Sequence, residues 1–287
     1  MYIKKFVLLA IVLTFGIGVT MAKDETGAED NVNGVYMRYV QWGDEAVAKQ
    51  KWEEAISYYR EAMTLEPSSP QNVMLLSNIG MIQHYEGNDS LALHTLSEAR
   101  AMAPASVVIL RNRANILLSM GRTDDALNDY NRVIEMDSTY AEAYYDRASI
   151  LLRRGALDKA EADALKYVNL RPDDLSGKLI MAVIYTNTAR PEDALPLYND
   201  LIKAQPDAVY YSARAMCRMA MDDLQEASND IALGLELDPN DGELYYCRAS
   251  LNILRYREED ARADAAKAVE LGVDKNRAEA LFRKSKK

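Results

Sequence analysis

Four arginines in this chain share one local setting, and each is followed sixteen residues later by an aspartate. The pairs are Arg113 and Asp129, Arg147 and Asp163, Arg214 and Asp230, and Arg248 and Asp264. A planar guanidinium can bind a carboxylate through two parallel hydrogen bonds, and ionisable pairs in apolar settings can also move protons. At three equivalent places both charges are absent together: Trp42 and Tyr58, Ile79 and Thr95, and Met181 and Leu197. Because the two positions change as a unit, we expect the partners to touch as structural ion pairs rather than to act as catalysts.

The remaining residues offer little catalytic chemistry. The chain has two histidines, His84 and His94, and no glycine-rich phosphate loop or residue cluster with metal-ligand spacing. Paired aspartates occur in "GRTDDAL" and "RPDDLSG", where carboxylates at a helix start can cap exposed backbone N–H groups. We therefore predict a protein that is not an enzyme, with no catalytic residues, no metal site and no cofactor.

Composition limits the classes of partner. The chain has 287 residues, of which 49% are hydrophobic, and a net charge of −10. Such an acidic surface argues against nucleic acid and against an anionic membrane surface as partners. The sequence leaves the oligomeric state open.

The N-terminal segment predicts export. "MYIKK" is a short basic region, "FVLLAIVLTFGIGV" is apolar, and "TMA" resembles a cleavage site, so residues 1–22 are interpreted as a signal peptide. The apolar stretch is shorter than the roughly 20 residues that span a membrane, although an uncleaved anchor is the alternative. Residues 23–35 are acidic and predict a flexible linker. The mature protein is expected to be periplasmic or secreted.

From residue 36 onward the sequence repeats itself. Alanines recur at intervals of 33 to 37 residues, at Ala55, Ala92, Ala126, Ala160, Ala194, Ala227 and Ala261. Twelve residues before each stands another small residue: Gly43, Gly80, Ala114, Ala148, Ala182, Ala215 and Ala249. Two small positions let two helices approach closely, and a turn between them is marked by Gly87, Gly121 and Gly155. The pattern predicts an all-α domain over 36–287, with repeats near 36–69, 73–106, 107–140, 141–174, 175–207, 208–241 and 242–275 and a capping helix at 276–285.

This pattern resembles the tetratricopeptide repeat family, and the resemblance covers residues 36–275. It implies a right-handed α-solenoid of seven helix-turn-helix repeats whose first helices line a concave groove. It further implies a protein-binding or peptide-binding scaffold, here of the cell envelope.

Reading the groove positions of the family onto this chain gives a polar half and an apolar half. The predicted partner-binding residues are Asn78, Tyr85, Arg111, Asn112, Asn115, Tyr145, Asp146, Ser149, Arg153, Leu179, Val183 and Tyr246. His84, Ile180, Met216, Met219, Ile253 and Leu254 occupy further groove positions. Such a surface suits an extended peptide or a helix, whereas the alternative is that the apolar residues only pack between repeats. A second functional hypothesis is an exported protein that binds small molecules or glycans with the polar half.

Two cysteines, Cys217 and Cys247, fall on the first helices of repeats six and seven. Export would permit a disulfide between them. Their places in the repeat lie one helical turn apart, which favours two buried thiols instead. The sequence leaves both alternatives open.

Overall fold

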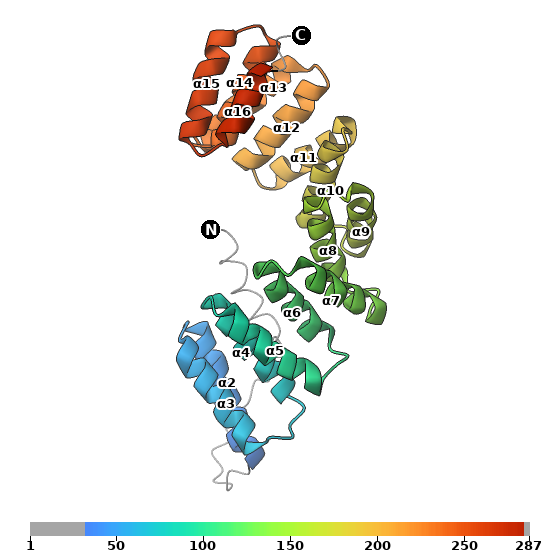
Figure 1. The fold of residues 1–287 in the computed structure, drawn as a ribbon, viewed down its shortest axis with the longest axis vertical. Helices are drawn as coiled ribbons and strands as arrows, with labels where there is room; N and C mark the ends of the chain where they lie inside the picture. Colours follow the sequence, from blue (N-terminus) through green and yellow to red (C-terminus); the bar gives the residue numbers. More distant parts are fainter. Residues whose placement is uncertain (1–31, 284–287) are drawn as a thin grey trace. The chain divides into compact units, whose positions relative to one another are not determined.

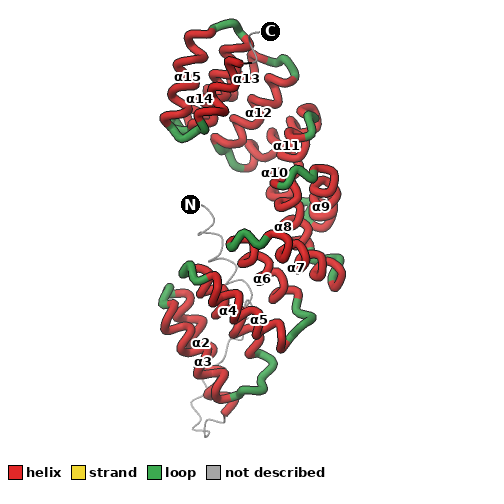
Figure 2. The backbone as a smooth tube through the Cα atoms, in the orientation of Figure 1, coloured by secondary structure: helices red, strands yellow, loops and turns green. Residues whose placement is uncertain are grey.

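The computed structural model describes residues 32–283, which form fifteen helices and no strand (Figures 1 and 2). The helices are α2 (Val32–Ala48), α3 (Trp52–Leu65), α4 (Asn72–Tyr85), α5 (Asp89–Met102), α6 (Val107–Ser119), α7 (Thr123–Met136), α8 (Ala141–Arg153), α9 (Leu157–Leu170), α10 (Leu175–Asn187), α11 (Pro191–Ala204), α12 (Ala208–Ala220), α13 (Leu224–Leu237), α14 (Gly242–Leu254), α15 (Glu258–Glu270) and α16 (Lys275–Arg283). The predicted all-α class, its seven helix pairs and its final capping helix are confirmed.

One predicted boundary is wrong. The linker was expected to continue to residue 35, but α2 begins at Val32. Tyr36 and Val40 on this helix are buried in the core of the first repeat. The helix that carries them begins one turn before Tyr36. The predicted signal peptide and the remainder of the predicted linker lie outside the described residues.

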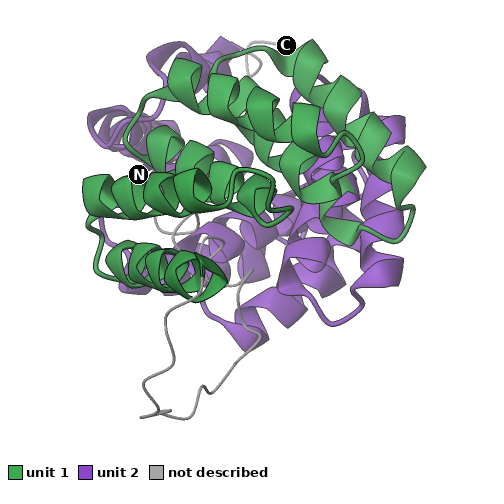
Figure 3. Ribbon diagram, turned by 90° about the horizontal axis from the view of Figure 1, so that it is seen from below, with its two compact units in different colours: residues 1–143 green, residues 144–287 purple. Residues whose placement is uncertain are grey.

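The chain divides into two compact units, residues 1–143 and residues 144–287 (Figure 3). The boundary falls within α8. In the first unit, each helix from α2 to α7 packs against the next one along the chain. In the second unit, α9 to α16 follow the same rule, and α12 and α14 also contact each other.

The repeated alanines explain why the helices pack as pairs. All seven of them, from Ala55 to Ala261, are completely buried. The other small position of the repeat, twelve residues before each of these alanines, is glycine in the first two repeats. There the helices lie closer still, since a Cβ atom on Gly43 would lie 2.4 Å from the ring of Tyr59. A side chain larger than alanine at these positions would overpack the contact between the two helices.

Every repeat turns between its helices on a residue in the left-handed backbone region. The glycines found in the sequence, Gly87, Gly121 and Gly155, are three of seven such residues. The other repeats use Gln50, Ala189, Asp222 and Tyr256, and φ lies between 55° and 85° at all seven positions. The left-handed conformation is unfavourable for residues with a Cβ atom, so these four turns are strained relative to the glycine turns.

Replacing Ala189 with glycine is therefore expected to raise the free energy of unfolding, by about 0.5–1 kcal/mol. The gain comes from removing the Cβ atom at φ 55°. Urea denaturation of the variant and the parent protein measures it. The reverse change, Gly155→Ala, should destabilise the fold, and equal midpoints for all three proteins would contradict the strain argument.

Candidate functional site

The four arginine–aspartate pairs join the two helices of their repeats. Arg147 donates from Nε and Nη2 to the two carboxylate oxygens of Asp163, at 2.6 Å each. Arg214 and Arg248 make the same two-pronged contact with their aspartates, with Nη2–Oδ1 distances of 2.6 Å. The pair of Arg113 and Asp129 differs, because a single Nη2–Oδ1 contact of 2.5 Å joins it. These geometries give the charged residues a clear structural role within each repeat.

Tyrosines three residues before the arginines complete three of these clusters. Arg147, Arg214 and Arg248 lie 5.8, 5.4 and 4.9 Å from the ring centroids of Tyr144, Tyr211 and Tyr245. At such distances a guanidinium is attracted to the face of an aromatic ring. Sequence reasoning missed these partners, although the recurring tyrosine at a constant spacing is visible in the sequence.

Where the charges are absent, other contacts occupy the same place. The rings of Trp42 and Tyr58 lie 5.7 Å apart in the first repeat. In the fifth repeat, buried Met181 and half-buried Leu197 pack within one hydrophobic cluster. The two positions therefore form a contact site between helices that either ions or apolar groups can fill.

Both cysteines are free and buried. The Cys217 thiol lies 3.7 Å from the hydroxyl of Thr186, and the Cys247 thiol lies 3.7 Å from the carbonyl oxygen of Ser212. Burial raises the pKa of Cys217, and it raises the pKa of Cys247 to about 12. Both groups are therefore neutral, poorly nucleophilic thiols at neutral pH.

In the first unit, most of the polar residues predicted to bind a partner contact neighbouring helices. Asn78 is buried with its amide beside the hydroxyl of Tyr59, while Asn115 accepts a hydrogen bond from the hydroxyl of Tyr130. Asn112 donates to the Ser77 hydroxyl at 2.9 Å and so links repeats two and three. These three amides satisfy buried groups of the repeats themselves.

Three other predicted groove residues of the first unit are half-buried. The ring of Tyr85 lies 4.9 Å from that of Trp52, and Arg111 lies on α6. His84 makes a 2.5 Å contact from Nδ1 to Asp89, which also accepts a hydrogen bond from Ser119. Asp89 thereby connects α4, α5 and α6.

In repeat four, the predicted residues have mixed surroundings. The ring of Tyr145 packs against that of Tyr167 in a tilted arrangement with centroids 5.1 Å apart, and burial raises the pKa of Tyr145. Tyr145, predicted to bind a partner, therefore packs against the core of its repeat. Ser149 donates to the carbonyl oxygen of Tyr145, Asp146 is half-buried, and Arg153 is exposed.

In repeat five, the apolar residues at the predicted groove positions are buried or half-buried. Leu179 packs against one hydrophobic cluster and Ile180 is buried in another. Val183 is half-buried. These residues follow the alternative in which apolar groove positions pack between repeats.

Repeats six and seven instead leave an apolar pocket open at the C-terminal end of the second unit. It has a volume of about 360 Å³, and we call it the apolar pocket. Its lining comes from α12, α14 and α16: Met216, Met219, Ala220, Tyr246, Ser250, Ile253, Leu254 and Leu281. Met216 and Leu254 are 40% and 48% exposed. The structure therefore brings together five residues that the sequence assigned to the groove.

The capping helix contributes two features that sequence reasoning missed at this site. Leu281 closes one side of the apolar pocket. The Arg277 guanidinium lies 4.1 Å from the ring centroid of Tyr246 and forms a 2.5 Å ion pair with Glu243. The sequence predicted a capping helix at 276–285 but not its part in the pocket lining.

The described residues contain no group of histidine, cysteine, aspartate and glutamate side chains that could hold a metal ion. None of the helices in residues 32–283 is long and apolar enough to cross a membrane.

The paired aspartates predicted to cap helices take different roles. Asp174 caps α10 by accepting a hydrogen bond from the backbone N–H of Ser176, whereas Asp125 bonds the side chain of Arg122.

Comparison with known proteins gives a consistent result. The family model for the tetratricopeptide repeat matches residues 111–174. A solved tetratricopeptide repeat protein from Parabacteroides merdae is 26% identical, with a TM-score of 0.65 over 88% of this chain and 99% of that chain. The solved structure of YrrB, described as a tetratricopeptide repeat protein with an unusual peptide-binding site, is 21% identical and shares the fold. Its TM-score is 0.54 over 66% of this chain and 97% of that chain.

A curated relative matches a shorter region. A tetratricopeptide repeat and J domain-containing co-chaperone of Cryptococcus neoformans is 31% identical over 114 residues. The match covers 40% of this chain and 22% of the relative. The chain thus spans less than a quarter of the length of the curated relatives that it matches.

Proposed function

This chain belongs to the tetratricopeptide repeat family, and we propose that it is a non-enzymatic scaffold of the cell envelope that binds a protein or peptide partner through its first helices. The observation that carries the proposal is the apolar pocket between α12, α14 and α16. An open pocket with exposed methionine and leucine side chains suits the apolar side chains of a partner. The lining also includes Tyr246 and Ser250, and the Ser250 hydroxyl already donates to the carbonyl oxygen of Tyr246.

The predicted polar groove residues of the first unit already contact other groups, and this supports a binding surface in the second unit. In the first unit, the amides of Asn78, Asn112 and Asn115 contact other groups of the repeats. A ligand at these amides would have to replace hydrogen bonds that already exist. The methionine, isoleucine and leucine side chains that line the apolar pocket make no hydrogen bonds, so a partner that covers them with apolar groups breaks none.

The similarity to YrrB and to the co-chaperone supports a role in binding proteins or peptides. The test is capture of partners from a native envelope extract by the immobilised protein, compared with a variant of the apolar pocket.

The proposal of export predicts that the mature protein begins at or near Lys23. Removal of residues 1–22 is the expected result of cleavage after "TMA". N-terminal sequencing and intact mass of the protein recovered from the envelope measure the start of the chain. A chain that retains Met1 and partitions with the membrane would contradict cleavage and support an anchor.

A further inference from the structure

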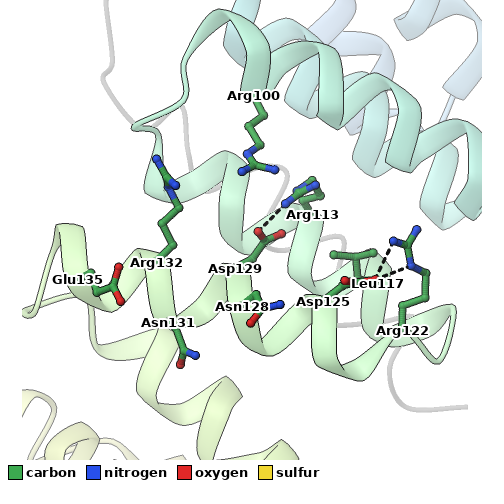
Figure 4. A pocket seen from close by; sticks show the side chains of 10 residues that line it. All are labelled: Arg100, Arg113, Leu117, Arg122, Asp125, Asn128, Asp129, Asn131, Arg132 and Glu135. Carbon is green, nitrogen blue, oxygen red and sulfur yellow. Dashed lines mark hydrogen bonds and ion pairs between the residues drawn. The ribbon is translucent and has the colours of Figure 1, made fainter.

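A second pocket lies in the first unit, between α5, α6 and α7 (Figure 4). It has a volume of about 520 Å³, and we call it the arginine pocket. Its lining is polar: Arg100, Arg113, Leu117, Arg122, Asp125, Asn128, Asp129, Asn131, Arg132 and Glu135. Four arginines and three carboxylates line it, so the pocket carries a net positive charge on a chain whose net charge is −10.

Arg100 occupies a position that is apolar in every other repeat. It stands eight residues after the repeated alanine of repeat two, on α5. The residues at this register in the other six repeats are Met63, Ile134, Val168, Ile202, Leu235 and Val269. All seven side chains are buried or half-buried. An arginine at a place that the fold fills with apolar side chains indicates a local departure made for function rather than for stability.

The charges of the arginine pocket are only partly neutralised. Arg122 pairs with Asp125 at 2.7 Å, and Arg113 pairs with Asp129. Within residues 32–283, Arg100 and Arg132 form neither an ion pair nor a hydrogen bond. Figure 4 shows Arg100 reaching from α5, and Arg132 from α7, toward the space between these helices.

The ion pair beneath this space is the incomplete one of the four. The Nε atom of Arg113 and the Oδ2 atom of Asp129 are buried and have no hydrogen-bond partner among the described residues. In the equivalent pair of Arg147 and Asp163, both prongs of the contact are made. The arginine pocket therefore combines an ion pair that has two unsatisfied buried atoms with two arginines, Arg100 and Arg132, that have no partner among the described residues.

From this arrangement we propose that the arginine pocket binds the phosphate group of a small ligand. Guanidinium groups bind phosphate through charge-assisted hydrogen bonds, and they can approach its oxygens from several directions. A planar carboxylate is already satisfied by one guanidinium, as the two-pronged pairs of this protein show. Two free guanidiniums on different helices suit a tetrahedral anion that offers more acceptors. This site is separate from the apolar pocket and independent of peptide binding.

The test is calorimetric titration of the full chain with inorganic phosphate at constant ionic strength, with potassium chloride as the reference salt. We expect saturable binding, at least tenfold weaker in Arg100→Leu and in Arg132→Gln, and absent in the double variant. The leucine variant should fold with an unchanged or higher melting temperature, because six repeats carry apolar residues at that position. Arg60→Gln is the matched control, since Arg60 is an exposed arginine of α3 in the same unit.

Two further probes define the chemistry. Glycerol phosphate tests a phosphate ester. Tighter binding than that of inorganic phosphate would indicate a phosphorylated metabolite, and weaker binding would indicate the free phosphate ion. Either result agrees with the proposal that the pocket binds phosphate. Glutamate tests a planar carboxylate and should bind at least tenfold more weakly. The proposal is overturned if phosphate shows no saturable binding, if the two arginine variants bind like the parent, or if glutamate binds as tightly as phosphate.

Discussion

Replacing Arg147 with alanine is expected to lower the free energy of unfolding by about 1–3 kcal/mol. The change leaves the carboxylate of Asp163 without its partner, and only 9% of that side chain is exposed. It also removes the guanidinium that lies over the ring of Tyr144. Denaturant unfolding followed by circular dichroism measures the loss.

The double variant Arg147→Met with Asp163→Leu copies the pair found in repeat five. It should recover much of the lost stability, because Met181 and Leu197 pack there without any charge. Arg214→Ala provides a second comparison and should cost less, since Arg218 also contacts Asp230, at 2.9 Å. Strictly additive losses in the double variant would mean that the two residues do not stabilise each other.

Much of the fold could be predicted from spacing alone. The repeated alanines are a strong signal, because close helix contacts tolerate only small side chains and the same contact recurs in each repeat. The turns were harder to identify, since Gln50, Ala189, Asp222 and Tyr256 adopt the left-handed conformation that glycine signals elsewhere. Packing of the whole hairpin imposes that conformation and overrides the preference of the single residue.

The candidate site could be predicted only in part, because register gives the face of a helix but not what covers it. Met216 and Tyr145 both lie on first helices, yet Met216 lines an open pocket and Tyr145 packs against the ring of Tyr167. Leu281 comes from the capping helix, outside the repeat register. Arg100 was detectable, since it breaks an otherwise apolar column of the repeat alignment. Its importance emerges only when the structure places it beside an unpaired arginine and an incomplete ion pair.

The apolar pocket provides the second large expected effect. Met216→Asp combined with Leu254→Asp should weaken partner capture at least tenfold, about 1.4 kcal/mol, while leaving the melting temperature nearly unchanged. Both side chains are well exposed, so the free protein can hydrate the new carboxylates. A partner that covers the pocket with apolar groups would have to desolvate two charges without pairing them. Capture from envelope extract, scored by the bands that each protein retains, measures the effect before any partner is identified.

The matched control is Leu233→Asp combined with Leu237→Asp, on the second helix of repeat six. These leucines are 43% and 53% exposed, which resembles the exposure of the pocket residues, and they lie on α13 outside the apolar pocket. The control adds the same two charges to the same unit, so it separates a local effect from a change in net charge. If the control loses the captured bands and the pocket variant keeps them, the partner binds the second helices and the proposed binding surface is wrong. If the pocket variant alone loses them, the first helices of repeats six and seven and the capping helix form the binding surface.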